Sequence, residues 1–204
     1  GRCQNVPVAE AAALFGQEMS DDEAESQPGM PDRHAHARFR AVLGHFPTGV
    51  VVVTALDPEG QPVGMSAGTF TSVSLEPPLV GFLAALTSTS YPRIRASGSF
   101  CVNVLNADQE PLCRSFAVSG SKKFDGIAWK PAGSGSPLLD GVVAWIDCDI
   151  EAVHRAGDHD IVIGRVRDLD VAGVDEPLLV LRGAFGHFAQ SSPGAPAQPD
   201  LFEP

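Results

Sequence analysis

The run GMSAGTFTSVSLEPPL combines small residues and hydroxyl groups directly before a Pro-Pro stop. Ser66, Ala67 and Gly68 are small enough to let a flat ligand approach the backbone. Ser72 and Val73 add a hydroxyl and amides a few residues later. A planar cofactor requires this combination of contact along its ring and hydrogen bonds at its edge. The run therefore indicates a cofactor surface, with an ordinary strand edge of solvated Ser and Thr as the alternative.

A second group of hydroxyl residues precedes a predicted helix that begins near Pro92. Ser88, Thr89 and Ser90 lie where hydroxyls and the amides of a helix N-terminus together favour a phosphate group. Arg93 and Lys123 are the cations within reach of this loop. The alternative interpretation is a loop with capping hydroxyls, together with a solvated surface lysine.

Five motifs in this order resemble those of the flavin reductase family, small reductases that supply reduced flavin to monooxygenases. The motifs are PTGVVVVT at 47–54, the run described above, TSTSYPRI at 87–94, KKF at 122–124 and GDH at 157–159. The resemblance covers roughly residues 39–188 and implies hydride transfer from NADH, in preference to NADPH, to FAD or FMN. Reduced flavin then passes to a partner monooxygenase component. No catalytic side chain is implied, because the hydride moves directly between the two cofactors.

The resemblance also implies roles for individual residues. Lys123 is expected to contact the flavin phosphate, with Phe124 packed beside it. His159 is expected to bind the nicotinamide nucleotide while Asp158 fixes the turn, and Phe185 either covers the ring or fills the barrel. The implied flavin contacts are Thr48, Ser66, Ala67, Gly68, Ser72, Val73, Ser88, Thr89, Ser90, Cys101, Lys123 and Phe124, and the implied nicotinamide contacts are His159 and Phe185.

Two other functions remain open on the same motifs. One is a flavin-binding electron-transfer module that keeps its flavin and has no reductase turnover with free flavin. The other is a pyridoxamine-phosphate-oxidase-like oxidase on the same type of barrel, which requires more basic residues around its phosphate substrate. The sparse arginines near the motifs speak mildly against the oxidase.

Short β-branched and apolar runs separated by turn residues predict a mainly β protein. Closure of so many strands removes exposed sheet edges, which favours a closed or split barrel, and the family resemblance implies a Greek-key split β-barrel of the FMN-binding type. The sequence leaves two roles open for Asn103, which are stabilising its strand and contacting the cofactor. We expect strands at 50–56, 62–70, 79–85, 100–105, 142–153, 160–172 and 178–188, short helices at 91–96 and 109–117, and a helix within 31–46, with Asp32 as its N-cap, that packs on the barrel.

The sequence predicts that the chain is divided into three parts. Residues 1–30 form an acidic extension that is expected to be flexible, residues 31–189 form the barrel domain, and residues 190–204 form a Pro-rich tail. The family resemblance implies a homodimer.

Composition excludes several classes of partner. A net charge of −11 and a pI near 4.8 oppose binding to nucleic acid or to an anionic membrane. The four cysteines lack a Cys-x-x-Cys spacing, so we predict neither a metal site nor a disulfide framework. No apolar run reaches the roughly 18 residues of a membrane span, and we expect a cytoplasmic protein.

Overall fold

The structure, a computed structural model, describes residues 33–120 and 122–189 of the 204-residue chain. Strands dominate the described part, which confirms the prediction of a mainly β fold. The helices are α2 (Arg33–Leu43), α3 (Tyr91–Ser97), the 3-10 helix η1 (Ala107–Gln109) and α4 (Glu110–Ala117). The strands are β1 (Thr48–Gly49), β2 (Val51–Leu56), β3 (Pro62–Ala67), β4 (Thr71–Ser74), β5 (Leu79–Ala85), β6 (Ser99–Val104), β7 (Trp129–Pro131), β8 (Pro137–Leu139), β9 (Ala144–Ala156), β10 (His159–Val171), β11 (Leu178–Leu181) and β12 (Ala184–His187).

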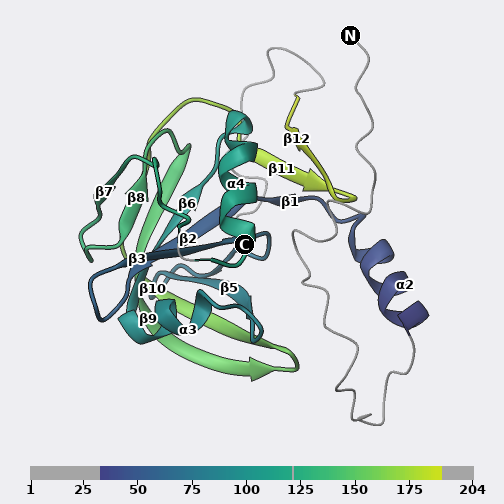
Figure 1. Cartoon of the computed structure of the whole chain (residues 1–204), viewed down its shortest axis with the longest axis horizontal. Coiled ribbons are helices and arrows are strands. Elements are labelled where there is room, and N and C mark those ends of the chain that lie inside the picture. The colour runs from purple at the N-terminus through teal and green to yellow at the C-terminus, as the bar shows by residue number, and fades with distance from the viewer. Residues whose placement is uncertain (1–32, 121, 190–204) are drawn as a thin grey trace.

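Seven strands form one antiparallel sheet in the order β3-β2-β6-β9-β10-β5-β4 (Figure 1). The two edge strands, β3 and β4, are joined by only three residues, 68–70. Such a link spans at most about 14 Å. The edges of a flat seven-stranded sheet lie about 29 Å apart. The sheet must therefore curl, and β3 indeed contacts β5 across the opening. The result is the predicted split, barrel-like architecture.

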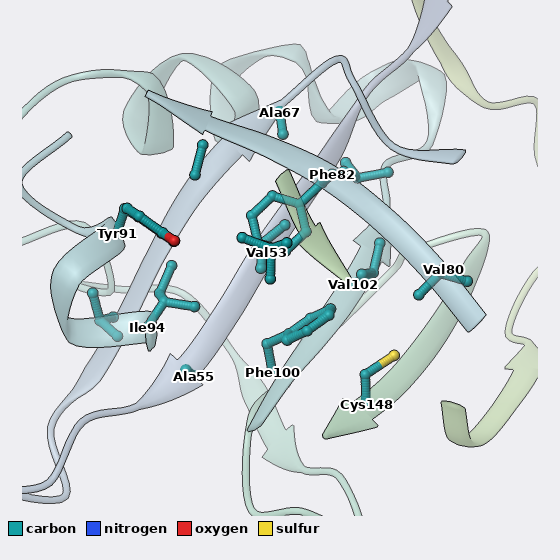
Figure 2. Packing of buried hydrophobic residues seen from close by; sticks show 14 residues of the cluster. Val53, Ala55, Ala67, Val80, Phe82, Tyr91, Ile94, Phe100, Val102 and Cys148 are labelled. Atoms are coloured by element: carbon teal, nitrogen blue, oxygen red, sulfur yellow. The ribbon is translucent and has the colours of Figure 1, made fainter. Parts of the chain in front are cut away.

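Strand β2 separates two apolar clusters by the alternation of its side chains. Val51 and Val53 face the interior of the curled sheet, where the rings of Phe82 and Phe100 meet edge to face at 5.3 Å (Figure 2). Val52 faces the opposite side and joins a second cluster that is covered by α4. The strand is buried on both faces, which explains its uninterrupted run of valines.

Three cysteines, Cys101, Cys113 and Cys148, are free and buried in these clusters. Burial raises the pKa of Cys113 to about 11 and that of Cys148 to about 12, and it also raises the pKa of Cys101. Because only thiolates react readily, we expect at most one of the four thiols to react with Ellman's reagent in the native protein and all four in denaturant. Rapid reaction of two or more native thiols would contradict this burial.

The prediction that the first helix packs on the barrel is wrong for this chain. Helix α2 stands apart from the main sheet (Figure 1), where its end is held by a hydrogen bond from the Arg182 amide to the Gly44 carbonyl at 2.8 Å. The two apolar clusters are built from strands, α3, α4 and connecting segments, and neither includes a side chain of this helix. Asp32, the predicted N-cap, lies outside the described residues. Four apolar side chains of this segment are more than half exposed: Phe39, Val42, Leu43 and Phe46.

The remaining differences concern strand boundaries. The single strand predicted at 178–188 is divided into β11 and β12 by a turn at Arg182 and Gly183, both of which have positive φ angles. Strands β1, β4, β7 and β8 were not predicted as separate elements. In residues 33–120 and 122–189, no helix is long and apolar enough to cross a membrane. The predicted extension at 1–30 and tail at 190–204 lie outside the described residues.

Candidate functional site

A small polar pocket lies between β3, α3 and the segment that follows α4. Three residues predicted from sequence, Ser90, Lys123 and Phe124, line this pocket together. Two cations, Lys123 and Arg93, face it from opposite elements, and Arg93 also binds Asp57 at 2.6 Å. The full lining is Pro62, Val63, Gly64, Ser90, Arg93, Gly120, Lys123 and Phe124.

Lys123 ties three elements together at this pocket. Its ammonium group lies 3.2 Å from the Gly64 carbonyl of β3, 3.1 Å from the Ser90 hydroxyl and 3.0 Å from the Phe116 carbonyl of α4. An ammonium group has three donors, so each has an acceptor within the protein. Burial lowers the pKa of Lys123. The ring of Phe124 packs edge-on against Phe116 at 5.0 Å.

The hydroxyl loop after β5 is folded against the turn between β9 and β10. The Leu86 amide donates to the Asp158 carbonyl at 3.0 Å, and the Ser88 hydroxyl accepts from the Tyr91 amide at 3.2 Å. Ser90 is buried, whereas Thr89 is exposed. One end of this five-residue loop therefore adjoins Asp158 and the other end adjoins Lys123.

His159 begins β10 directly beside this loop, in register with Ala85 at the end of β5. Its Nδ1 lies 2.7 Å from the Asp158 carboxylate, and this hydrogen bond is the main reason that the pKa of Asp158 is lowered. A carboxylate only accepts, so Nδ1 carries the proton and Nε2 remains as the second ring nitrogen for a ligand. The side chain of His159 is 38% exposed, which leaves it accessible to a nucleotide.

The run of small residues on β3 alternates between two faces. Ser66 is half-buried beside Cys113 on the α4 side, whereas the Ala67 side chain points into the core. Gly68 is half-buried just beyond the strand. Ser72 and Val73 are exposed on β4, which follows after a three-residue link. Of this set, only Ala67 presents its side chain to the interior, so it can meet a ligand only through its backbone.

The third group of predicted residues lies on the small sheet β1-β11-β12. Thr48 is half-buried opposite Val180, which in turn pairs with Phe185. The guanidinium group of Arg114 lies 5.0 Å from the centre of the Phe185 ring. Phe185 therefore combines packing in the α4-side cluster with a partly accessible ring, and its contact with a cofactor ring stays a prediction.

Cys101 and Asn103 do not reach a surface. Both are fully buried, so the Cys101 side chain cannot meet a molecule bound outside the core, and we leave it out of the candidate site. Asn103 lies 3.1 Å from the Val52 carbonyl and 3.0 Å from the Thr54 hydroxyl, and accepts from the Leu139 amide at 2.8 Å. These contacts support the role of Asn103 in stabilising its strand, and not the alternative role of contacting the cofactor.

Three groups of this region were not predicted from sequence. They are Asp57, which forms an ion pair with Arg93, Arg114 beside Phe185, and the buried carboxylate of Asp160. Asp160 directly follows the GDH motif, which is the one local signal that could have drawn attention to it.

Comparison with known proteins agrees with this geometry. Residues 43–189 match the model of the flavin reductase like domain, so the chain belongs to the flavin reductase family. It is 55% identical over 151 residues to a flavin reductase of Pseudomonas putida, a match that covers 74% of this chain and 89% of the relative. It is 47% identical over 148 residues to the reductase subunit of a flavin-dependent monooxygenase from Rhodococcus jostii, covering 72% and 75% of the two chains.

A solved structure shows the same fold. The NADH:FAD oxidoreductase of Streptomyces globisporus, in complex with NAD and FAD fragments, superposes with a TM-score of 0.73 at 38% identity. The match covers 80% of this chain and 99% of that one.

Proposed function

We propose that this protein is an NAD(P)H-dependent flavin reductase that takes a hydride from NADH, in preference to NADPH, and delivers reduced FAD or FMN to a monooxygenase. One observation from the structure supports the proposal in addition to the family membership of the chain. The loop of residues 86–90 adjoins Lys123 at one end and the turn before His159 at the other. The proposed phosphate-binding group and the proposed nucleotide-binding group thus adjoin the two ends of one short loop.

The donor set of the pocket suits a flavin phosphate. Ser90 supplies a hydroxyl inside the pocket, and Ser88 and Thr89 supply hydroxyls in the adjoining loop. The half-buried Lys123 supplies a positive charge that few solvent molecules screen. When bound, a flavin supplies the hydride-accepting chemistry. The protein's own task is to bind and align two nucleotides and to exclude water between them. The proposed flavin contacts are Thr48, Ser66, Gly68, Ser72, Val73, Ser88, Thr89, Ser90, Lys123 and Phe124, with Ala67 contributing its backbone.

Trp129 provides a direct test of flavin binding. Its ring centre lies 6.4 Å from that of Phe124, so its fluorescence should respond to a ligand at this pocket. We expect FAD or FMN to quench it saturably and dialysis to restore it, as for a flavin that diffuses between two proteins. Flavin that survives dialysis, in a protein that does not oxidise NADH, would favour the electron-transfer module. An absence of quenching by either flavin would contradict the proposal.

Replacing His159 by alanine tests the nicotinamide assignment. We expect the KM for NADH to rise about tenfold, the size of one lost hydrogen bond to a charged ligand, while flavin affinity changes by less than about twofold. His154→Ala is the matched control, because His154 is an exposed histidine on the neighbouring strand β9, opposite Ile161. Equal loss of flavin and NADH affinity in His159→Ala would remove His159 from this role.

We also propose that the protein is a homodimer in the cytoplasm. The exposed apolar side chains of the α2 segment, Phe39, Val42, Leu43 and Phe46, support self-association because so large an apolar face is unusual on a monomer. The free, buried thiols fit a reducing compartment. Sedimentation at micromolar concentration distinguishes the dimer from a monomer.

A further inference from the structure

Asp160 is a buried carboxylate that directly follows His159 in β10. Only 2% of its side chain is exposed. It accepts hydrogen bonds from the Tyr91 hydroxyl at 2.8 Å, from Arg155 Nε at 2.9 Å and from Arg95 Nη1 at 3.3 Å. These partners come from α3 and β9, so one carboxylate links three elements. A buried carboxylate is costly unless it is paired and hydrogen-bonded, and here both conditions are met.

Tyr91 connects this carboxylate to the hydroxyl loop. It is buried, with 3% of its surface exposed, and it is the first residue of α3 immediately after Ser90. Its amide donates to the Ser88 hydroxyl at 3.2 Å, while its own hydroxyl donates to Asp160. Burial and the hydrogen bond to Asp160 raise the pKa of Tyr91 to about 12, so the phenol stays a donor at neutral pH. The loop and β10 are therefore joined through one side chain.

The position of the hydrogen bond between Tyr91 and Asp160 favours a role in arranging the proposed site. Asp160 neighbours His159 in the chain, and Tyr91 neighbours Ser90, so the bond joins the proposed nicotinamide group to the proposed phosphate loop. The hydrogen bond from the Leu86 amide to the Asp158 carbonyl joins the same two segments at the other end of the loop. The hydrogen bond from Tyr91 is the largest of the effects that lower the pKa of Asp160, and the charges of Arg155 and Arg95, which are more than half exposed, lower it further.

We propose that Asp160 is a positioning residue which, through Tyr91, holds the Ser88–Ser90 loop at a fixed distance from His159. One consequence of this positioning role rests on the proposed function: flavin affinity should depend on the hydrogen bond between Tyr91 and Asp160. The hydride transfer itself is unaffected, because neither side chain meets the reacting atoms. The link between the loop and β10 is a property of the protein without ligand and can be measured as such.

Tyr91→Phe is the test variant, because it removes the hydroxyl and keeps the ring in the core. We expect amide hydrogen exchange at residues 86–90 of the flavin-free protein to become about tenfold faster, the effect of losing one buried hydrogen bond. We expect the KM for flavin to rise about tenfold as well, with kcat changed by less than about twofold. Asp160→Asn should act in the same direction, and should it fail to fold, Tyr91→Phe decides alone.

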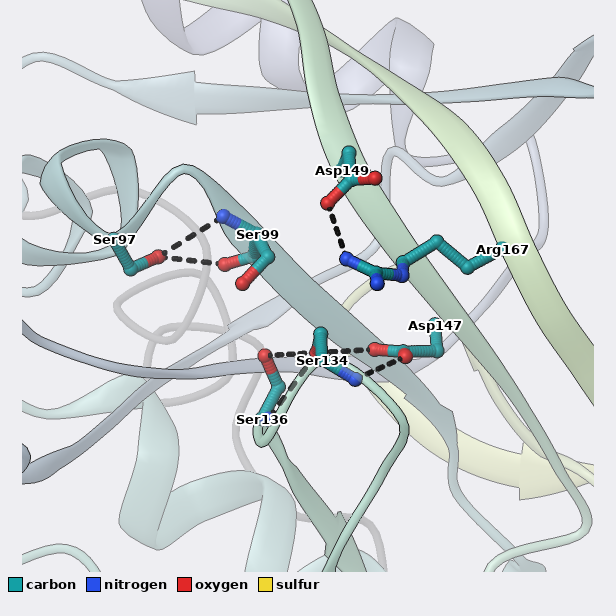
Figure 3. Close-up of polar contacts among 7 residues, drawn as sticks. All are labelled: Ser97, Ser99, Ser134, Ser136, Asp147, Asp149 and Arg167. Carbon is teal, nitrogen blue, oxygen red and sulfur yellow. Dashed lines mark hydrogen bonds and ion pairs between the residues drawn. The ribbon is translucent and has the colours of Figure 1, made fainter.

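Asp147→Asn is the matched control. Asp147 is a fully buried carboxylate that accepts from the Ser134 amide at 2.7 Å and from its hydroxyl (Figure 3). It lies on β9 eight residues before Arg155, which is about 26 Å along a strand. Its replacement should lower the melting temperature without changing exchange at residues 86–90 or the KM for flavin.

The outcomes of these experiments distinguish the positioning role of Asp160 from its consequence for flavin binding and from the proposed function. Unchanged exchange at residues 86–90 in Tyr91→Phe, or an equal increase in Asp147→Asn, overturns the positioning role. A faster loop with an unchanged KM for flavin overturns its consequence for binding. If the unmodified protein does not oxidise NADH with added flavin, the proposed function fails, and the exchange experiment still decides whether Asp160 holds the loop.

Discussion

Replacing Asn103 by leucine should lower the free energy of unfolding by about 3 to 5 kcal/mol. The amide is fully buried between β2, β6 and β8. Leucine has similar size but leaves the Leu139 amide without its acceptor and the Val52 carbonyl and Thr54 hydroxyl without this donor. Each buried polar group left unpaired costs about 1 to 3 kcal/mol, and partial relaxation reduces the sum. Urea unfolding of both proteins measures the difference.

Thr54→Val is the control for this network. The Thr54 hydroxyl lies 3.1 Å from the Cys101 carbonyl and is also hydrogen-bonded to the Pro137 carbonyl and Asn103, so its loss removes a smaller part of the same network. We expect a cost of about 1 to 2 kcal/mol, and a double variant that costs less than the sum of the two. A cost below about 1 kcal/mol for Asn103→Leu would show that the network does not hold these strands.

Replacing Lys123 by methionine should raise the KM for flavin by about 10- to 100-fold. To bind phosphate, Lys123 exchanges one of its three acceptors within the protein for a phosphate oxygen. A hydrogen bond between charged groups contributes about 1.5 to 3 kcal/mol, and the half-buried site of Lys123 weakens solvent screening. Methionine preserves most of the side-chain volume, so the pocket keeps its shape. Steady-state kinetics with varied flavin at saturating NADH measures the effect.

The neighbouring Lys122 provides the control, because it is exposed where Lys123 is half-buried. Lys122→Met removes the same charge and should leave the KM for flavin within about twofold of its original value. Since Lys123 also binds the Gly64 and Phe116 carbonyls, its replacement will lower the melting temperature too. A lower melting temperature with an unchanged KM for flavin would make Lys123 a structural tie and would remove it from the phosphate site.

The long and strongly patterned elements could be predicted from the sequence. Strand β5 was predicted with its observed bounds, and α3 and α4 within one residue at each end, because apolar and β-branched runs there end at clear turn residues. Strands β7 and β8 have three residues each, too few to establish a period of two. The exposed face of α2 could not be predicted either, because helical spacing indicates an apolar face but does not identify the surface that covers it.

The order of motifs predicted which residues lie close together around the pocket. Ser90, Lys123 and Phe124 lie together although more than 30 residues separate the first two. Strand register, which decides whether a side chain faces the core, is harder to predict. Cys101 faces the core for this reason. The bond between Tyr91 and Asp160 joins residues 69 apart and has no local sequence signal.

The most direct test of the account is the steady-state oxidation of NADH and of NADPH by the purified protein, with FAD, with FMN and without added flavin. We expect turnover that requires added flavin, saturates with it and is faster with NADH. No turnover with either flavin, or turnover at full rate without added flavin, would contradict a reductase that uses flavin as a diffusing substrate.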